Sequence, residues 1–300
     1  MLDLTVIILT KNEALHLRRV LTNVAPIAKR VVVVDSGSTD STVDIARECG
    51  AEVVENAWPG NQAAQFNWAI DNLDITTEWI LRLDADEYLT PELIDELKAK
   101  LHILPSDVSS ISLKRARCFA GKRIRHGIVN SVNLIRIFRR GTARYENRLM
   151  DEHLKILSGR TVEMRNKFVD DNLMPISDFI IKHIGYANRE AATMLDAKYG
   201  LSDSSEINDA VLGDKVEDKR RQKQRYAKMP MFWRAWAYFI YRYIFRLGFL
   251  DGTEGFLWDF MQGYWYRVLV DANIREILKE SGGDREQMKK IIAERGIKLK

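Results

Sequence analysis

Trp79-Ile80-Leu81-Arg82-Leu83-Asp84-Ala85-Asp86-Glu87 joins a mostly apolar run to a group of acids. Such a run is typical of a strand that is buried on both faces of a sheet. Other stretches that are expected to be strands precede it at residues 4–9, 31–34 and 52–55. The segments between these runs carry apolar residues at helical spacing. Repeated strand–helix units predict an α/β fold, with a parallel sheet that is covered by helices on both faces.

Capping and turn residues indicate where the helices begin and end. Ser41 together with Asp44 predicts a capping box at the start of one helix, and Gly50 is a natural end for it. Thr90 followed by Pro91 predicts the start of another helix, because threonine caps helices and proline suits the first helical position.

The pattern changes after about residue 105. Strands are expected at residues 110–113 and 134–138. The basic and polar segment between them, residues 115–133, is expected to be a long loop. From about residue 176 onward the apolar spacing predicts helices to the end of the chain.

The composition is that of a globular protein: of 300 residues, 46% are hydrophobic and 29% charged. Two cysteines, Cys49 and Cys118, are too few for a disulfide framework and suit a reducing compartment. No Cys/His cluster has the spacing of a zinc site. The N-terminus has no basic segment, and no run of about 18 uncharged apolar residues occurs, so we expect neither a signal peptide nor a membrane-spanning helix.

Acids follow three of the four predicted strands directly. Residues 10–13 (Thr-Lys-Asn-Glu) follow the first strand, residues 35–38 (Asp-Ser-Gly-Ser) the second and residues 84–86 (Asp-Ala-Asp) the fourth. Ligands of open parallel sheets bind outside the carboxyl ends of the strands. Carboxylates that are gathered at one edge repel one another unless a cation offsets their charge. A metal ion is the simplest solution to that repulsion.

Asp84 and Asp86 have the position expected for ligands of a hard cation. Magnesium typically takes one or two protein carboxylates together with substrate phosphates. Two oxygens of a nucleotide diphosphate would complete its shell, and the metal would stabilise the departing diphosphate. The alternative is a pair of exposed loop acids that bind nothing.

Asp35 and Glu13 are further candidates. A carboxylate suits the ring N–H of a uracil or guanine base, so we favour Asp35 as a ligand group over a turn or capping residue. Glu13 either binds a ligand or is a surface acid at a helix N-terminus, where the helix dipole favours it. No G-x-G-x-x-G loop is present, which argues against a Rossmann dehydrogenase.

Three motifs, at residues 5–13, 33–42 and 83–87, together resemble the inverting family-two glycosyltransferases, whose fold is called GT-A. The resemblance covers about the first hundred residues. It implies a mixed, mainly parallel sheet, a nucleotide-diphosphate sugar as donor, and a divalent Mg or Mn cation. It implies that Asp86 contacts the metal. It also implies that the donor is bound at the strand ends by Thr10, Asn12, Glu13, Asp35, Ser36, Gly37, Asp84 and Ala85.

Within that family the chain most resembles the subgroup that includes lipopolysaccharide-core β-glucosyltransferases. The likeness extends to residues 248–252 and to the aromatic segment after them. The chain departs from the wider family at residues 62–67, where many members carry a basic residue and this sequence has none. The identity of the nucleoside is therefore left open.

An inverting transfer needs a base that takes the proton from the acceptor hydroxyl. Family members place an acid in a short motif after the metal site, and the matching stretch here is residues 148–154. The resemblance favours Glu152 over the adjacent Asp151, and the alternative is that both are exposed loop acids. His153 is left out of the metal shell, because a lone histidine is more often structural.

The segment from Pro230 to Leu250 is rich in aromatic residues, and Arg234, Arg242 and Arg246 fall on roughly one side of a helix. A basic face opposite an aromatic face is typical of a helix that lies on a membrane. The basic run that precedes this segment, Lys219, Arg220, Arg221, Lys223, Arg225 and Lys228, favours anionic lipid headgroups. The alternative is a core helix whose arginines extend into solvent.

We therefore predict a GT-A catalytic domain over residues 1–175, with nucleotide binding at about 1–105 and the acceptor side at about 106–175. Residues 176–300 are predicted to form a helical region associated with the acceptor or the membrane. The expected reaction moves a sugar, with inversion, to a hydroxyl of a glycolipid or cell-surface polysaccharide precursor. We expect a cytoplasmic enzyme, peripheral on the inner face of the cell membrane and attracted to its anionic surface, and no nucleic-acid partner.

Three alternatives fit parts of the pattern. A sugar-phosphate nucleotidyltransferase needs a glycine-rich, basic phosphate loop after the first strand, and residues 10–13 do not form one. A phosphatase would use Asp84 as nucleophile and Asp86 as acid, but such enzymes usually carry this pair after the first strand. A catalytically inactive, membrane-bound scaffold would not need the full set of acids.

Overall fold

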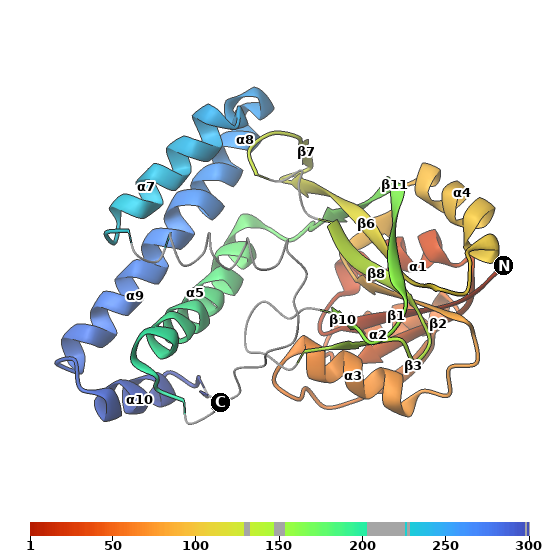
Figure 1. Cartoon of the computed structure of the whole chain (residues 1–300), viewed down its shortest axis with the longest axis horizontal. Coiled ribbons are helices and arrows are strands. Elements are labelled where there is room, and N and C mark those ends of the chain that lie inside the picture. The colour runs from red at the N-terminus through yellow and green to blue at the C-terminus, as the bar shows by residue number, and fades with distance from the viewer. Residues whose placement is uncertain (129–132, 147–153, 203–225, 227–228, 298, 300) are drawn as a thin grey trace. The chain divides into compact units, whose positions relative to one another are not determined.

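The structure is a computed structural model that describes the chain except for residues 129–132, 147–153, 203–225, 227–228, 298 and 300. The chain divides into two compact units, Met1–Met174 and Pro175–Lys300 (Figure 1). The first unit is an α/β unit, and the second consists of helices.

One sheet organises the first unit. Its order is β3-β2-β1-β4-β8-β6-β11-β5, and β7 pairs with β6 (Figure 1). β1 to β4 pair in parallel, β8 is inserted antiparallel between β4 and β6, and β11 runs parallel to β6. The strands are β1 (Leu2–Thr10), β2 (Ala28–Asp35), β3 (Glu52–Glu55), β4 (Trp79–Asp84), β5 (Glu87–Leu89), β6 (Val108–Phe119), β7 (Lys122–Ile124), β8 (Asn133–Arg139) and β11 (Arg160–Asp171). The predicted α/β fold with a mixed, mainly parallel sheet is confirmed.

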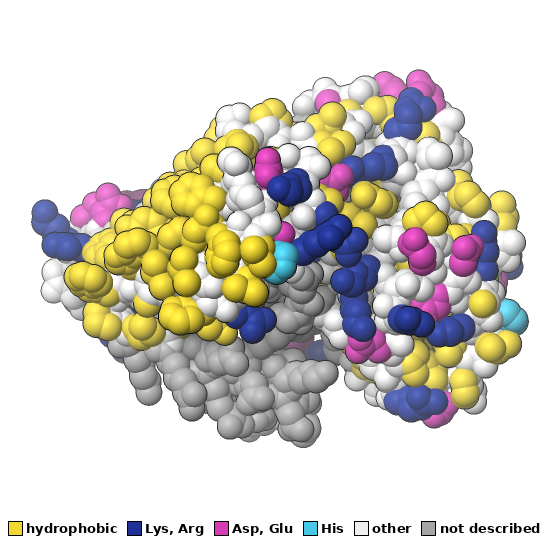
Figure 2. Space-filling view, turned by 90° about the horizontal axis from the view of Figure 1, so that it is seen from above, with side chains coloured by type: hydrophobic (Ala, Val, Ile, Leu, Met, Phe, Trp, Pro, Cys, Tyr) yellow, Lys and Arg dark blue, Asp and Glu magenta, His cyan; other side chains and the backbone are white. Residues whose placement is uncertain are grey.

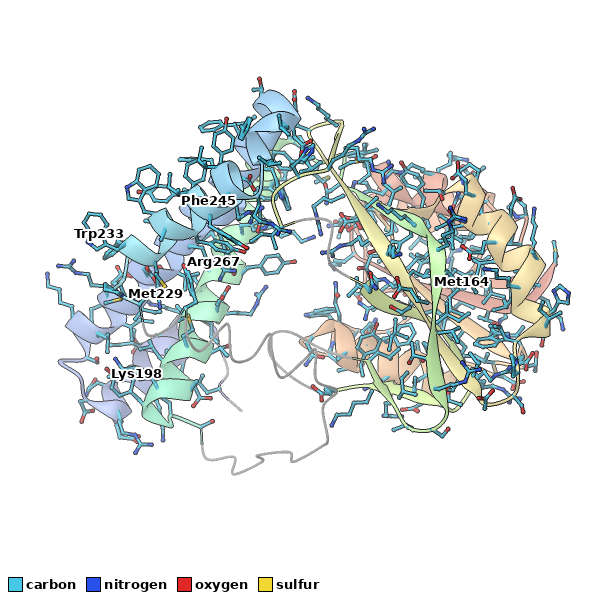
Figure 3. All side chains as sticks on the ribbon, turned by 45° about the horizontal axis from the view of Figure 1, so that its top comes forward. Met164, Lys198, Met229, Trp233, Phe245 and Arg267 are labelled. Carbon is cyan, nitrogen blue, oxygen red and sulfur yellow. The ribbon has the colours of Figure 1, made fainter. Side chains whose placement is uncertain are left out.

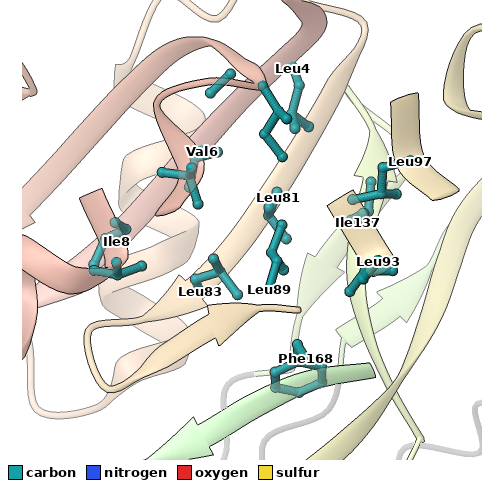
Figure 4. Packing of buried hydrophobic residues seen from close by; sticks show 14 of the residues in the cluster. Leu4, Val6, Ile8, Leu81, Leu83, Leu89, Leu93, Leu97, Ile137 and Phe168 are labelled. Atoms are coloured by element: carbon teal, nitrogen blue, oxygen red, sulfur yellow. The ribbon is translucent and has the colours of Figure 1, made fainter. Parts of the chain in front are cut away.

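The two faces of the sheet are buried under helices, which explains why its central strands are apolar throughout. Leu4, Val6 and Ile8 of β1 pack on one face with side chains of α1 (Ala14–Val24), α2 (Thr42–Glu48) and α4 (Pro91–Lys100), as Figure 4 shows in part. Ile7 of β1 points to the other face and packs with Phe66 of α3 (Gln62–Asn72). Burial of one such side chain stabilises the fold by roughly 1.5–3 kcal/mol.

The register brings the carboxyl ends of the parallel strands to one edge. Thr10 of β1 pairs with Asp35 of β2, and Leu9 of β1 pairs with Asp84 of β4. Asp35 in turn pairs with Glu55 of β3. The polar residues that follow these strands therefore start at the same level of the sheet.

The helix caps agree with the sequence at one position and differ at another. The Thr90 side chain accepts a hydrogen bond from Leu93 N (3.3 Å), so the predicted cap of α4 is confirmed. The predicted capping box of Ser41 is wrong, because its side chain makes no capping bond. Asp40 takes that role one residue earlier: its Oδ1 accepts from Thr42 N (3.0 Å).

The segment predicted as a long loop is partly sheet. β6 continues through residue 119 and turns back into β7, so residues 115–124 belong to a hairpin. The basic side chains of β6 have partners there: Arg115 and Arg117 form ion pairs with Asp170 of β11. A charged side chain that finds a partner on the next strand is compatible with a buried sheet, and composition alone does not reveal that partner.

Helices form the second unit, as expected. They are α5 (Ile176–Tyr199), α7 (Trp233–Ile240), η3 (Tyr241–Phe245), η4 (Gly248–Asp251), α8 (Gly252–Trp258), η5 (Asp259–Trp265), α9 (Tyr266–Glu280) and α10 (Arg285–Glu294). The segments η3 and η5 are π-helical, and η4 is a 3₁₀ turn. The core lies between α5, α9 and α10, where Leu195, Val270 and Met288 are buried.

The arginines of the aromatic segment face inward, not outward. Arg234 and Arg242 are buried and form ion pairs with Asp271 and Asp259. The predicted exposed basic face is therefore wrong for these two residues, and so is the alternative in which they extend into solvent. Arg246 is the member of the trio that is exposed.

The Glu96 carboxylate joins α4 to β11. It accepts hydrogen bonds from Lys100 Nζ (2.7 Å), Arg165 N (3.1 Å) and both Asn166 N (2.9 Å) and Asn166 Nδ2 (3.0 Å). Burial opposes ionisation, but these hydrogen bonds outweigh it and lower the pKa of Glu96 to about 2.

We expect Glu96→Gln to lower the free energy of unfolding by about 1–3 kcal/mol at neutral pH, because backbone donors lose a charged acceptor. The folded-state pKa lies below the ordinary value of 4.5. Ionised Glu96 therefore stabilises the fold above about pH 4.5, and this contribution is lost as the pH falls toward 2. Urea unfolding across this pH range measures the effect. Asp95→Asn, an exposed acid on the same helix, is the control, and equal pH dependence of the two variants would contradict the prediction.

Candidate active site

Hydrogen bonds join the loops that follow β1 and β2. Thr10 Oγ1 donates to Asp35 Oδ1 (2.9 Å), and Asn12 N donates to Ser38 Oγ (2.8 Å). Asn12 Oδ1 accepts from Thr39 N (2.8 Å). Asn12 has a φ of 56°, a left-handed conformation in which asparagine is tolerated better than most residues. Three of the predicted donor-binding residues thus belong to one pair of linked loops.

Asp35 organises the loop after β2. The residue is 1% exposed, and its Oδ1 accepts from Thr10 Oγ1 and Ser38 Oγ (2.6 Å). Its Oδ2 accepts from Gly37 N (2.8 Å) and Ser38 N (2.7 Å). A carboxylate has about four lone-pair positions, so these four bonds occupy them. Recognition of a base by Asp35 would require the exchange of one of these bonds.

Two side chains that were not predicted hold the Ser36-Gly37 turn from either side. Lys11 Nζ donates to Ser36 O (3.0 Å) and to Gly37 O. Gln65 of α3, which is fully buried, donates from Nε2 to Ser36 Oγ (3.1 Å). Gly37 has a φ of 81°, which favours glycine over other residues. The turn is therefore built before any ligand binds.

Glu13 contacts His16, and this pair connects the β1 loop to the end of β11. His16 Nδ1 lies 2.7 Å from Glu13 Oε2, and His16 Nε2 accepts from Leu173 N (3.0 Å). A ring nitrogen that accepts an amide hydrogen carries no proton of its own. His16 Nδ1 is therefore the ring nitrogen that can donate to Glu13.

Asp84 ends β4 between two arginines. Its Oδ1 lies 3.3 Å from Arg82 Nη2 and its Oδ2 lies 3.3 Å from Arg136 Nη2. The side chain is 33% exposed, so it remains accessible to a ligand from the solvent side. Ala85 is buried in the core, which leaves its backbone as the part that can contact a ligand.

Asp86 is oriented by the end of β11. Its Oδ2 accepts from Asn172 Nδ2 (3.1 Å), and its backbone oxygen accepts from Asp171 N (3.0 Å) and Arg19 Nη2 (3.3 Å). Its Oδ1 accepts no hydrogen bond from any residue that the structure describes. The described residues thus leave one oxygen of this oriented carboxylate available to a ligand.

Arginine side chains lie beside the acids of this edge. Glu87 is buried and forms an ion pair with Arg136, while its Oε2 accepts from Asp84 N (3.0 Å). Burial raises the pKa of Glu87, and the neighbouring carboxylates of Asp84 and Asp170 act in the same direction against Arg136. Guanidinium groups therefore offset part of the repulsion from which we predicted a metal.

The donor set still suits a cation that is shared with a ligand. Outside the gaps named above, no three His, Cys, Asp or Glu side chains are grouped as a metal site. An all-protein metal cage is therefore not formed by the described residues. Magnesium, however, usually binds through one or two carboxylates and completes its shell with phosphates and water. The available oxygen of Asp86 fits that chemistry.

Arg82 and Arg136 were missed because each interrupts an apolar strand. A charged residue inside a strand that is otherwise buried must have a partner, so its position was itself a signal. Arg82 also donates to Gln62 Oε1 (2.9 Å) and stacks 4.5 Å from the centre of the Tyr145 ring. It supplies a cation beside the segment of α3 that lacks one.

Asp151 and Glu152, the predicted catalytic bases, lie outside the described residues, as does His153. Their assignment stays a prediction.

The first unit is an α/β unit with a mixed sheet, and its D-x-D turn lies beside the linked loops of the first two strands. This arrangement defines a glycosyltransferase domain of the GT-A type. The chain belongs to Glycosyl transferase family 2, whose profile matches residues 5–173. This membership does not favour the nucleotidyltransferase, phosphatase or scaffold alternatives.

Two Rickettsia proteins are similar to this chain over most of its length. An uncharacterized glycosyltransferase of Rickettsia bellii (strain RML369-C) is 29% identical over 272 residues, which is 90% of this chain and 85% of that protein. One of Rickettsia typhi (strain ATCC VR-144 / Wilmington) is 26% identical over 284 residues, covering 94% and 89%.

Among solved structures, S. aureus TarS 1–349 aligns with a TM-score of 0.44 and 16% identity, covering 100% of this chain and 93% of that one. Glucosyl-3-phosphoglycerate synthase from Mycobacterium tuberculosis, in complex with Mn²⁺, UDP-glucose and phosphoglyceric acid, aligns with a TM-score of 0.32 and 20% identity. That alignment covers 39% of this chain and 44% of that one.

We expect Arg136→Met to lower the free energy of unfolding by about 3–5 kcal/mol, because it leaves Glu87 buried without a counter-ion. Replacing both partners, as Arg136→Met with Glu87→Leu, should recover part of that loss. The single variant should gain stability as the pH is lowered, since burial raises the folded-state pKa of Glu87 and the folded state then binds the proton more tightly.

Chemical unfolding at several pH values measures these differences. Arg144→Met, which breaks an exposed ion pair with Asp71, is the control and should cost about 0–1 kcal/mol. A double variant no more stable than Arg136→Met would contradict the assigned pair.

Proposed function

We propose that this enzyme transfers a sugar, with inversion, from a nucleotide-diphosphate donor to a hydroxyl of a glycolipid or cell-surface polysaccharide precursor. Family membership supports the reaction class. The observation that carries the proposal is Asp86: its carboxylate is oriented by Asn172 and keeps one oxygen available, next to the strand end that carries Asp84. A donor diphosphate with a Mg²⁺ or Mn²⁺ ion fits that oxygen.

In this proposal Asp86 and the diphosphate of the donor would hold the cation. When bound, it would stabilise the negative charge that builds on the departing diphosphate. Asp84, which lies between Arg82 and Arg136, would accept hydrogen bonds from hydroxyls of the donor sugar. Because both carboxylates are already oriented, little reorganisation accompanies donor binding.

The nucleoside would bind over the linked loops. Thr10, Asn12 and Asp35 lie together there, with the Ser36-Gly37 turn beside them. Glu13 would support this loop through His16. These assignments rest on the placement of the residues and on the family resemblance. A binding panel of UDP-, GDP- and dTDP-sugars identifies the nucleoside.

The acceptor hydroxyl would lose its proton to a carboxylate, and we propose Glu152 for this role with Asp151 as the second candidate. Removal of the proton makes the hydroxyl oxygen a better nucleophile toward the anomeric carbon of the donor. Attack from the side opposite the departing diphosphate inverts the configuration at that carbon.

The proposed acceptor places the reaction at the cytoplasmic surface of the cell membrane, where the enzyme would be peripheral. No helix in the described part of the chain is long and apolar enough to cross a bilayer. The basic run at residues 219–228 would favour an anionic surface. Lipopolysaccharide-core precursors are acceptors of the proposed kind. We propose no role in binding nucleic acid.

We expect Asp86→Asn to lower donor-dependent turnover by about 100-fold or more, because the substitution removes the anionic ligand of the cation. Asn172→Ala should weaken metal affinity by about 10–100-fold, as is typical of a residue that orients a metal ligand. Titration of Mn²⁺ and of the donor, with turnover measured in parallel, tests both variants. Turnover that persists unchanged in excess chelator would rule out the proposed cation.

We expect Glu152→Gln to lower turnover by about 100-fold or more while donor affinity stays near the wild-type value, because glutamine keeps the shape but cannot take the proton. Single-turnover rates and donor titration separate the two quantities. Asp151→Asn serves as the matched variant. If Asp151→Asn is the damaging change and Glu152→Gln is mild, the base is Asp151.

A further inference from the structure

The second unit exposes large apolar side chains between residues 233 and 256. Phe245 is 73% exposed and Trp233 69% exposed. Figure 2 shows hydrophobic side chains gathered over the helices of this unit. We call the following residues the aromatic face: Trp233, Trp236, Phe245, Leu247, Phe249 and Leu250. A continuous apolar area of this kind marks a site of contact with a partner.

Two charged side chains of this segment, Arg234 and Arg242, point into the unit and not toward the aromatic face. Arg234 Nε donates to Asp271 Oδ1 (2.9 Å), and Arg242 Nε donates to Asp259 Oδ1 (2.8 Å), with all four residues buried. Between residues 229 and 264, a stretch described without gaps, Arg246 is the exposed charged residue. The helical segment formed by α7 and η3 thus has its charged side inside and its apolar side outside, an arrangement that suits an apolar environment. Figure 3 shows Trp233 at the edge of the unit and directed away from it.

The turn at residues 244–250 is closely packed and contains a strained backbone conformation. Leu247 has a φ of 60°, a conformation that a leucine adopts with strain. A side chain at Gly248 would collide with the Asp259 carboxylate, and one at Gly255 would lie 2.5 Å from Gly248 O. The close packing leaves the backbone of this turn little freedom. The exposure of Leu247 at a strained position is explained if its side chain is buried in an apolar layer outside the protein.

Lipid can cover the side chains of this turn more completely than the surface of another protein can. Residues 244 to 247 are exposed one after another, and Phe249 and Leu250 follow them. Consecutive residues of a helix or turn point in different directions. A second copy of the chain would present a surface that covers one side of the turn, whereas lipid surrounds it on all sides. Trp and Tyr side chains also favour the interface between water and lipid, and Arg246 can reach a phosphate headgroup from there.

We propose that the aromatic face inserts into the interfacial layer of a lipid bilayer, with the turn at residues 244–250 as the deepest part. Attachment then depends on buried apolar area and persists at high salt. This inference rests on the proposed function only for the statement that the acceptor is at a membrane, because binding to lipid is measurable without donor or acceptor.

The test uses the full chain and vesicles of phosphatidylcholine, with a second set that also contains phosphatidylglycerol. Wild-type protein should float with both kinds of vesicle and remain bound to phosphatidylcholine at high salt. Phe245→Glu and Leu250→Glu should each lower the bound fraction by about tenfold or more, since each replaces inserted apolar area by a charge. Ile103→Glu, on a residue of the first unit that is 67% exposed, is the control and should float like the wild type.

Tryptophan fluorescence adds a readout that does not depend on flotation. Vesicles with brominated acyl chains should quench Trp233 and Trp236, and the quenching should decline in Trp236→Phe. Thermal melting confirms that each variant is folded, and Leu250→Ala replaces any glutamate variant that is not.

Three results would overturn the inference. The first is flotation of Phe245→Glu that equals that of the wild type. The second is binding restricted to anionic vesicles and abolished by salt, which would assign attachment to the basic residues. The third is a wild-type dimer that Phe245→Glu converts to a monomer, without vesicle binding by either. Donor titration in solution is independent of all three results. Intact donor binding without flotation would contradict only the membrane inference. Flotation without donor binding would contradict only the proposed function.

Discussion

The buried pairing of Arg136 with Glu87 is the interaction on which the candidate active site depends. Glu87 accepts the backbone N–H of Asp84, and Arg136 contacts the Asp84 carboxylate, so one pair holds both the backbone and the side chain of the D-x-D turn. A buried pair of this kind adds little net stability but enforces one geometry, because either partner alone would be costly. The turn is therefore fixed by the protein before donor or metal arrives.

The sequence predicts the strands and the edge where the polar residues gather, because continuous apolar runs and their order determine both. It does not predict the partners of the acids. Arg136 of β8 contacts Asp84 from 52 residues further along the chain, and Asn172, just after β11, contacts Asp86 from 86 residues further along. Those contacts depend on the insertion of β8 next to β4 and on the path of β11, and no local pattern encodes either. The metal was inferred from repulsion between acids, without knowledge of the arginines that lie beside them.

The helical unit shows a different limit. Apolar spacing reveals that a helix has two unlike faces, but it does not reveal which of them packs inward. The usual assumption places charge outside. Here Asp259 and Asp271 are buried beneath α7 and η3 and draw Arg242 and Arg234 inward, so the aromatic side chains are left at the surface. The acids that decide this lie 17 and 37 residues further along the chain.

The π-helical segments η3, which runs into the 244–250 turn, and η5, which comes after it, have a consequence for how this region tolerates insertion and deletion. A π-helical stretch is an α-helix that holds an extra residue within a turn. Loss of one residue from η3 would restore α-helical winding and rotate everything after it by about 100°. Arg242 of η3 pairs with Asp259 of η5, so the two irregular stretches are locked to each other. The number of residues in η3, as well as the chemistry of its side chains, therefore sets the direction in which the turn points.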